Sequence, residues 1–402
     1  MTTTPLPDAA PATYGGLLRA PGVPLLFGLS LAHVLGSSLQ MFALSVVVYE
    51  QTGSAAWSSA AFAAGFLPQL LGGALLTSLA DRLPARPVLV VSAAVRVAVA
   101  ALLALGHLSA AWAIGLVAVV AVWQPLPQAV QSALVSRLLT GDLYVLGRSV
   151  FNVISYGAQL LGLALGGAVI AALGASTTFA SAAAIQLVGM LAALAIPVTG
   201  LVKPEGRWRP GETWSGNLAL LRDRAIRHVL LSWWVPITLL VGAEAIIVAY
   251  VGESGGKPDS AGLLLAAFPA GAAVGDLVVG RWVSEAARRR LVPVLFVLVG
   301  VPLVPLAWGP STPVTLALFA LASAATAYQL GGQQAFLEAV PEDRRGLAFG
   351  LYGTGLMTGQ GLGPVAAGGL ADVVGAALTI TVLGGLVLVA APFLARLPTR
   401  RD

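Results

Sequence analysis

Charged residues are almost absent from long stretches of this 402-residue chain, and these stretches recur from about residue 21 to residue 397. Each stretch holds roughly 20 residues or more, enough for an α-helix to cross a hydrocarbon core about 30 Å thick. Because that core offers no water to the backbone, the stretches are expected to be helices. Charged residues form only 10% of the chain, against roughly 25% in soluble domains, which excludes a water-soluble globular fold.

The apolar stretches predict an all-α membrane protein with twelve transmembrane helices in two six-helix bundles. We expect the helices at 21–49, 55–79, 87–108, 110–136, 147–173, 176–200, 229–251, 260–280, 291–309, 312–338, 346–371 and 375–396. The corresponding division of the chain is a cytoplasmic tail at 1–20, a first bundle at 21–200, a cytoplasmic linker at 201–228, a second bundle at 229–397 and a cytoplasmic tail at 398–402.

The distribution of positive charge predicts the orientation in the membrane. Of the 22 Lys and Arg residues, 20 fall in segments that share one side if the twelve helices alternate, Lys257 falls on the other side and Arg96 lies within a helix. Cytoplasmic loops carry the excess of Lys and Arg in membrane proteins. The sequence therefore predicts a multi-pass protein of the inner (plasma) membrane with both termini in the cytoplasm. Orientation explains the net charge of +5 without a nucleic-acid partner.

Matches between the two halves of the chain indicate an internal repeat. At an offset of 201 residues, half the chain length, Gln128 aligns with Gln329 and Gln159 aligns with Gln360. Glutamine is rare enough in both halves for these pairs to carry weight. Paired halves of this kind are typical of membrane transporters.

A short motif links the chain to a known family. Residues 77–86, TSLADRLPAR, resemble the Gly-x-Leu-Ala-Asp-Arg-x-Gly-Arg-Arg/Lys signature that lies between helices two and three of the major facilitator superfamily. Thr77, Pro84 and Ala85 depart from that signature. The resemblance implies a gating role for the residues Asp81, Arg82 and Arg86, which would hold the cytoplasmic side closed in one state. The alternative is a loop whose charges serve orientation alone.

Other segments are similar to one branch of that superfamily, the macrolide and siderophore exporters, which are drug and proton antiporters. The similar segments are 17–19, 49–54, Pro125 with Ala129, and the small-residue run at 158–167. This resemblance implies efflux. Small residues at such spacing also permit plain helix packing, so that alternative stays open.

Glutamine stripes predict the substrate site. Gln124, Gln128 and Gln131 follow i, i+4, i+7 spacing on the fourth helix, and Gln329 and Gln333 lie four apart on the tenth. The resemblance implies that helices one, four, seven and ten surround one central cavity, together with His33, Gln40 and Trp123. Neutral amides favour a neutral or amphipathic compound. The alternative is that the amides only bridge helices.

Three ionisable residues within the apolar stretches are candidates for proton coupling: Glu244, Arg96 and Asp276. Charged groups inside a membrane are costly and mark transport pathways. Glu244 lies among Val, Ala and Ile, surroundings that disfavour the charged carboxylate, and is the strongest candidate. Asp276 has an alternative as an ion-pair partner of Arg281. Arg96 has an alternative as the neutraliser of an acid between packed helices.

The chain contains no cysteine and no nucleotide-binding, metal-binding or catalytic motif, so the sequence predicts neither an enzyme nor a cofactor. With the family resemblance, it predicts a secondary active transporter, functional as a monomer, that uses a proton gradient to export a hydrophobic or amphipathic small molecule. One alternative is an importer or uniporter of a small organic nutrient on the same fold. Another is a non-transporting membrane receptor or lipid-handling protein.

Overall fold

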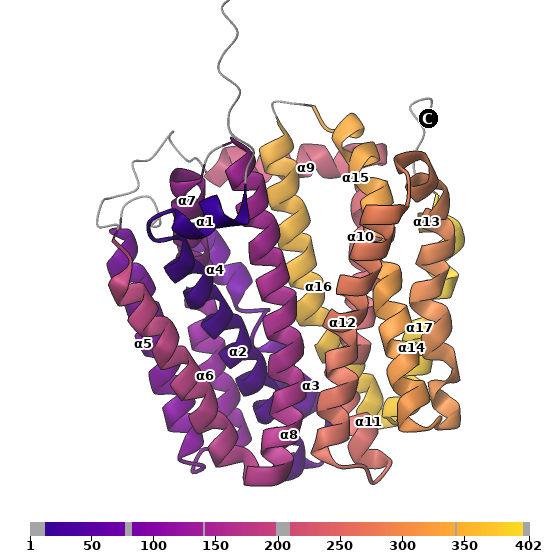
Figure 1. Ribbon diagram of the computed structural model, residues 1–402. Coiled ribbons are helices and arrows are strands. Elements are labelled where there is room, and N and C mark those ends of the chain that lie inside the picture. The colour runs from indigo at the N-terminus through magenta and orange to yellow at the C-terminus, as the bar shows by residue number, and fades with distance from the viewer. Residues whose placement is uncertain (1–12, 77–82, 140, 198–209, 342–343, 397–402) are drawn as a thin grey trace, which may run out of the picture.

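The computed structural model describes residues 13–76, 83–139, 141–197, 210–341 and 344–396, and every regular element in these ranges is a helix (Figure 1). Nine helical segments of this described part are long and apolar enough to cross a membrane. The prediction of an all-α membrane protein is therefore confirmed. The nine segments include one of 50 residues, Leu146–Ala195, which covers two of the twelve expected helices.

The first bundle is formed by the helices that precede residue 196. Its elements are α1 (Tyr14–Arg19), α2 (Val23–Thr52), α3 (Ala55–Ala63), α4 (Gln69–Leu76), α5 (Ala85–Ala104), α6 (Ala110–Trp123), α7 (Pro125–Leu138) and α8 (Gly141–Ala195). Two expected helices, 147–173 and 176–200, run together in α8. Its two arms meet at Gly174, whose φ of 79° lies in the left-handed region that favours glycine.

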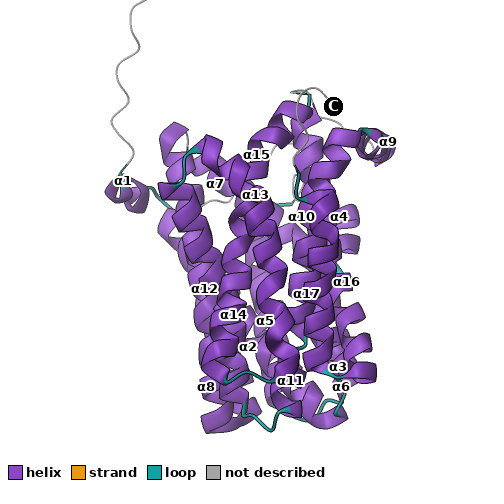
Figure 2. Cartoon of the chain, turned by 90° about the vertical axis from the view of Figure 1, so that its right-hand side faces the viewer, coloured by secondary structure: helices purple, strands orange, loops and turns teal. Residues whose placement is uncertain are grey.

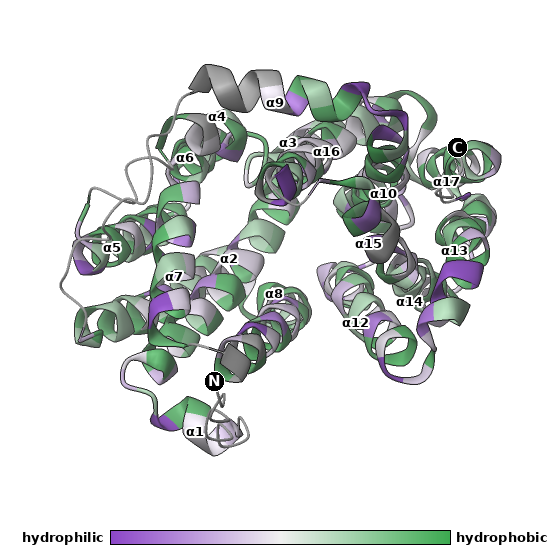
Figure 3. Ribbon diagram, turned by 90° about the horizontal axis from the view of Figure 1, so that it is seen from above, coloured by the Kyte–Doolittle hydropathy of each residue, from purple (hydrophilic) through white to green (hydrophobic). Residues whose placement is uncertain are grey.

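The second bundle follows α9 (Pro210–Arg222), which lies at one end of the molecule (Figure 2). Its elements are α10 (Arg224–Ala245), α11 (Ile247–Glu253), α12 (Pro258–Trp282), α13 (Glu285–Gly300), η2 (Val301–Trp308), α14 (Thr312–Ala324), η3 (Ala325–Ala327), α15 (Tyr328–Ala339), α16 (Arg345–Val374) and α17 (Ala376–Leu394). Seen along the helices, α1–α8 and α10–α17 form two groups (Figure 3).

Several expected helices are broken rather than continuous. The second expected helix becomes α3 and α4, with a turn at Gly65 and Pro68 between them, and the fourth becomes α6 and α7, which meet at Pro125. Proline removes a backbone donor and clashes with the preceding turn, which explains the break at Pro125. The ninth expected helix becomes α13 and the 3-10 helix η2, which begins at Val301 and contains Pro302 and Pro305.

The two bundles approach each other closely at the end of the molecule that holds Gly174 and α11. There α8 meets α12 with so little space that a Cβ atom on Gly262 would lie 2.6 Å from the Cα of Gly167. Nearby, α3 packs against α16, and the carboxylate of Asp372 accepts hydrogen bonds from the first turn of α3. Glycine at the α8–α12 crossing is therefore required by the packing of the two bundles.

Candidate functional site

Two cavities between the helices are lined by polar side chains. The first, which we call the N-terminal cavity, has a volume of about 290 Å³ and lies within the first bundle, between α2, α5, α6 and both arms of α8. The second, the central cavity, has a volume of about 470 Å³ and lies between the first arm of α8 and the helices α10, α12, α15 and α16. Gln159 on α8 lines both cavities, so the two are neighbours.

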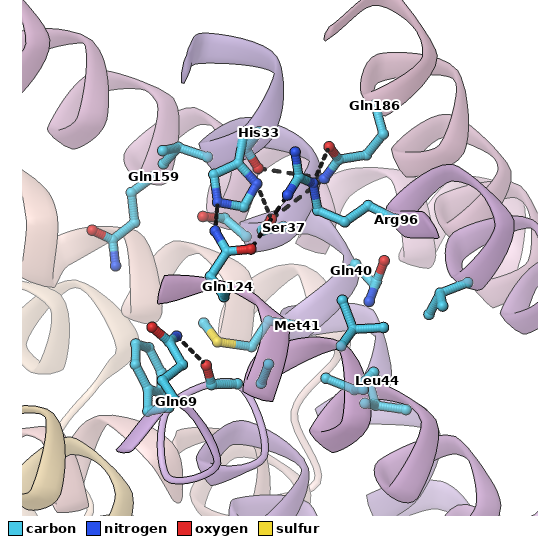
Figure 4. A pocket seen from close by; sticks show the side chains of 18 of the residues that line it. His33, Ser37, Gln40, Met41, Leu44, Gln69, Arg96, Gln124, Gln159 and Gln186 are labelled. Atoms are coloured by element: carbon cyan, nitrogen blue, oxygen red, sulfur yellow. Dashed lines mark hydrogen bonds between the residues drawn. The ribbon is translucent and has the colours of Figure 1, made fainter. Parts of the chain in front are cut away.

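A closed ring of hydrogen bonds forms one wall of the N-terminal cavity (Figure 4). Its members are His33, Ser37, Arg96, Gln124 and Gln186. Arg96 donates through Nη1 to Oε1 of Gln124 (3.3 Å) and through Nε to Oε1 of Gln186 (3.4 Å). Ser37 Oγ closes the ring, since it lies 3.2 Å from His33 Nδ1 and accepts a hydrogen bond of 3.3 Å from Gln186 Nε2. We call this set the Arg96 ring.

The chemistry of arginine fixes the direction of every bond in the Arg96 ring. A guanidinium has only donors, so both glutamines must turn their oxygens toward Arg96 and their NH₂ groups away. Gln124 then donates to Nε2 of His33, which must be unprotonated at that nitrogen. His33 carries its proton on Nδ1 and donates it to Ser37. The ring therefore holds His33 as a neutral imidazole beside a charged guanidinium.

The central cavity is lined by two carboxylic acids of the second bundle, Glu244 on α10 and Asp276 on α12. Glu244 is only 7% exposed, and its Oε1 has no hydrogen-bond partner in the part of the chain that the structure describes. It lies two residues before Ile246, where α10 gives way to α11. Across the cavity, Tyr352 donates to Oε1 of Gln329 (3.2 Å). This arrangement places a buried carboxyl at the boundary between the bundles.

The predicted substrate residues separate into two groups instead of surrounding one cavity. His33, Gln40, Gln124 and Gln128 line the N-terminal cavity, whereas the side chains that line the central cavity include Gln329 and Gln333. The reason lies in the fold of the first bundle. There α8 packs against α2 and α5, and these helices enclose a cavity that is separate from the central one.

Two of the predicted substrate residues line neither cavity. The indole N–H of Trp123 donates to Ser92 Oγ (2.7 Å), and the amide of Gln131 donates to the backbone carbonyl of Leu26 (3.3 Å). Both side chains bridge helices of the first bundle. The expected stripe from Gln124 to Gln131 assumed one continuous helix, and the break before Pro125 interrupts it.

The predicted gating and coupling residues lie in different parts of the molecule. Asp81 and Arg82 lie outside the described residues, while Arg86 lies in the first turn of α5. Asp276 lines the central cavity, and the structure shows no ion pair between it and Arg281. Among the described acids, Glu338 does form a salt bridge, a 3.8 Å contact with Arg289 between α15 and α13.

Several residues that line the cavities were missed from the sequence, among them Ser37, Gln186, Tyr156 and Tyr352. Single serines, tyrosines and one isolated glutamine form no stripe, so no spacing pattern points to them. Gln159 and Gln360 are different, because the half-chain repeat pairs them, and both line the central cavity. The repeat was a usable signal for this site.

Comparison with known proteins agrees with this architecture. Residues 245–402 match the family model described as Major Facilitator Superfamily. No curated protein sequence matches the chain.

Solved transporter structures share the whole fold at low sequence identity. The nucleoside transporter NupG superposes with a TM-score of 0.73 at 13% identity, covering 94% of this chain and 100% of that one. A bacterial homologue of the human lysosomal transporter Spinster, in an inward-facing and unoccupied conformation, gives 0.68 at 14% identity over 93% and 96% of the two chains. The human organic anion transporter TETRAN gives 0.62 at 18% identity over 93% and 98%. The chain therefore has the major facilitator fold.

Proposed function

We propose that this chain is a secondary active transporter of the major facilitator superfamily, which moves a small organic molecule across a membrane by alternating access. The observation that carries the proposal is the buried carboxyl of Glu244, which has no partner among the described residues and lines a cavity between two bundles. An ionisable group at such a place is expensive in a membrane, and transport pathways are where proteins retain one. The fold supports the same function, because its two bundles can rock about a cavity between them.

The close contacts between the bundles suggest which transport state the structure represents. They gather at the end of the molecule that holds Gly174 and α11, away from the termini. The excess of Lys and Arg supports cytoplasmic termini, and in that orientation this end faces outward. We therefore propose an inward-facing state, with the central cavity closed toward the outside.

Glu244 is our candidate for the coupling residue, with Asp276 as a second acid in the same cavity. Protonation removes the charge of Glu244 and with it the cost of closing apolar helices around that group. Loss of the proton toward the cytoplasm and uptake of a proton from outside would then bias the two states in opposite directions. In this scheme an amphipathic molecule leaves the cell as protons enter, and the energy source is the proton gradient.

A growth screen followed by a flux assay tests this function. The chain is expressed in a bacterial strain that lacks its own drug exporters, and toxic amphipathic compounds are scored for increased tolerance. A compound found in this way is then added to proteoliposomes that contain a pH-sensitive dye and carry an imposed proton gradient. Proton antiport predicts that the compound dissipates the gradient. Movement of the compound in the same direction as the protons would favour an importer, and no movement in either direction would contradict the proposal.

A further inference from the structure

The guanidinium of Arg96 lies inside the first bundle without an anionic partner. Its side chain is 8% exposed, and its two hydrogen-bond acceptors, Gln124 and Gln186, are both neutral. In the part of the chain that the structure describes, no Asp or Glu forms an ion pair with Arg96. The interpretation that Arg96 neutralises an acid between packed helices therefore has no support there. A buried charge without a counter-charge is strongly unfavourable, which indicates that something else supplies the negative charge.

The Arg96 ring leaves part of the guanidinium free for a ligand. Arginine has five N–H donors, and the bonds to Gln124 and Gln186 occupy one on Nη1 and the one on Nε. The second N–H of Nη1 and both of Nη2 have no protein acceptor among the described residues. The terminal N–H groups of a guanidinium form a planar fork that matches the two oxygens of a carboxylate. Because the ring holds the guanidinium from two sides, the fork is oriented before a ligand arrives.

The other side chains of the N-terminal cavity indicate that the anion should have an apolar organic body. Apart from its glutamines, the cavity is lined largely by apolar side chains, including Met41, Phe66, Val99 and Val117. A small inorganic anion would leave these walls unused, whereas an organic body beside a carboxylate would contact them. The volume of about 290 Å³ suits a small molecule of this kind.

We propose that Arg96 is the anchor of an anion-binding site in the N-terminal cavity, and that its ligand is an organic carboxylate with an apolar body. This inference rests on the proposed transport function for its biological meaning, because it names the class of molecule carried. It also narrows the expectation of a neutral or amphipathic compound to an amphipathic anion. Gln124 and Gln186 act as positioning residues that aim the guanidinium at the ligand, and Gln159 links the cavity to the central one.

The site is tested by equilibrium binding of radiolabelled benzoate and cinnamate to the purified full chain in detergent. Benzamide serves as the neutral analogue of benzoate, and chloride as the inorganic anion. We expect saturable binding of at least one carboxylate, displaced by its unlabelled form and displaced at least tenfold less effectively by benzamide or chloride. Equal displacement by benzamide, displacement by chloride at the same concentration, or no saturable binding of either carboxylate would overturn the proposal.

Variants of the anchor give a second test. Arg96→Gln should weaken carboxylate binding at least tenfold, and Arg96→Lys, which keeps the charge without the fork, should weaken it less. The matched control is Arg148→Gln, which removes an exposed cation of α8 and should leave binding unchanged. Unchanged binding in Arg96→Gln would refute the assignment. If that variant does not fold, the competition experiment on the unaltered protein decides alone.

This binding experiment is independent of transport. A chain that binds benzoate through Arg96 but moves no compound in proteoliposomes would keep the anion site and lose the transporter function. A chain that exports compounds but binds neither carboxylate would keep the function and lose the anion site.

Discussion

At the residue scale, the Arg96 ring shows how one buried amide can bond to two neighbours at once, a guanidinium and an imidazole. Gln124 is 8% exposed, gives its oxygen to Arg96 and gives its NH₂ group to His33. An apolar side chain in its place would leave a guanidinium donor and an imidazole acceptor unsatisfied in a buried site. Unsatisfied buried polar groups cost about 1–3 kcal/mol each.

We therefore predict that Gln124→Leu, which leaves two such groups unsatisfied, lowers the free energy of unfolding by about 2–6 kcal/mol. The matched control is Gln128→Leu, because Gln128 lines the same cavity but is exposed. That variant should change stability by less than about 0.5 kcal/mol. Denaturant titration of both variants in the same detergent measures the difference. Equal stability of the two variants would mean that the ring contributes nothing to the fold.

Glu244 carries the second prediction at this scale. Glu244→Gln keeps the size of the side chain but cannot exchange a proton, so gradient-driven transport should be lost while substrate binding persists. Glu338→Gln is the control, because Glu338 is a surface acid, and its salt bridge with Arg289 is of the exposed kind that contributes little. Parallel flux and binding assays on the two variants provide the measurement. Normal active transport by Glu244→Gln would remove this residue from the coupling mechanism.

Sequence reasoning found the residues of the site whose chemistry is unusual in a membrane, but not the way they are arranged. Arg96, Glu244 and Gln124 stand out because charged and amide side chains are rare among apolar neighbours. Ser37 and Gln186 do not stand out in the sequence, because a single hydroxyl or amide forms no periodic pattern with other polar residues. The bonds that join them to Arg96 depend on how α2, α5 and α8 pack, which no local pattern encodes.

At the element scale, hydrophobic length predicted where helices exist, and local backbone chemistry decided where they break. The stretch 110–136 reads as one apolar helix, yet Pro125 divides it into α6 and α7. The stretch 147–200 reads as two helices, and the two arms of α8 are indeed separated by a kink at Gly174, whose positive φ is not helical. Hydropathy measures how favourably a segment transfers into lipid. A break in a helix depends instead on a missing backbone N–H donor or on a non-helical φ angle, so hydropathy does not predict where helices break.

The crossing of α8 and α12 supplies a prediction at this scale. Gly262→Leu would place a side chain where the backbone of Gly167 lies, so the bundles should separate at this end. Gly280→Leu on the same helix is the control, because a Cβ atom there meets only one side-chain atom, 3.9 Å away.

The chain has no native cysteine, so Thr326→Cys provides a single thiol in the wall of the central cavity. In the Gly262→Leu background, a membrane-impermeant maleimide added from the side of α11 should label this thiol faster. The Gly280→Leu background should not change the rate. Equal labelling in both backgrounds would show that this crossing does not hold the bundles together.

At the scale of the whole molecule, the internal repeat predicted more than the division into halves. Gln159 and Gln360 are 201 residues apart and come from different bundles, yet both line the central cavity. A duplicated helix keeps its orientation toward the shared interface, which explains why equivalent residues meet there. The repeat does not account for the Arg96 ring, which lies wholly within the first bundle: Arg96 has no counterpart at that offset, where Val297 stands.

Asp372, near the end of α16, joins the two bundles by hydrogen bonds. Its Oδ1 accepts hydrogen bonds from the backbone N–H groups of Ala55 (2.6 Å) and Ala56 (3.2 Å), and its Oδ2 accepts one from the hydroxyl of Ser54 (2.6 Å). These groups form the start of α3, so a carboxylate of the second bundle caps a helix of the first. A cap of this kind stabilises a helix by about 0.5–2 kcal/mol. Because the cap comes from the other bundle, it stabilises α3 only while α3 and α16 are in contact.

We predict that Asp372→Ala shifts the balance between states toward the one in which this end is open, by roughly two- to thirtyfold, which is the population ratio that corresponds to the lost cap. Spin labels on cysteines introduced at Trp57 and Val373, both exposed, would report the separation of α3 and α16 by pulsed electron resonance. The population with the longer distance should grow in Asp372→Ala and stay constant in Asp259→Ala. Asp259 is an acid at the same end whose carboxylate, among the described residues, bonds only to its neighbour Ser260. If the distance distribution is the same in all three proteins, the cap does not bias the transport cycle, and the glycine crossing of α8 and α12 must close this end alone.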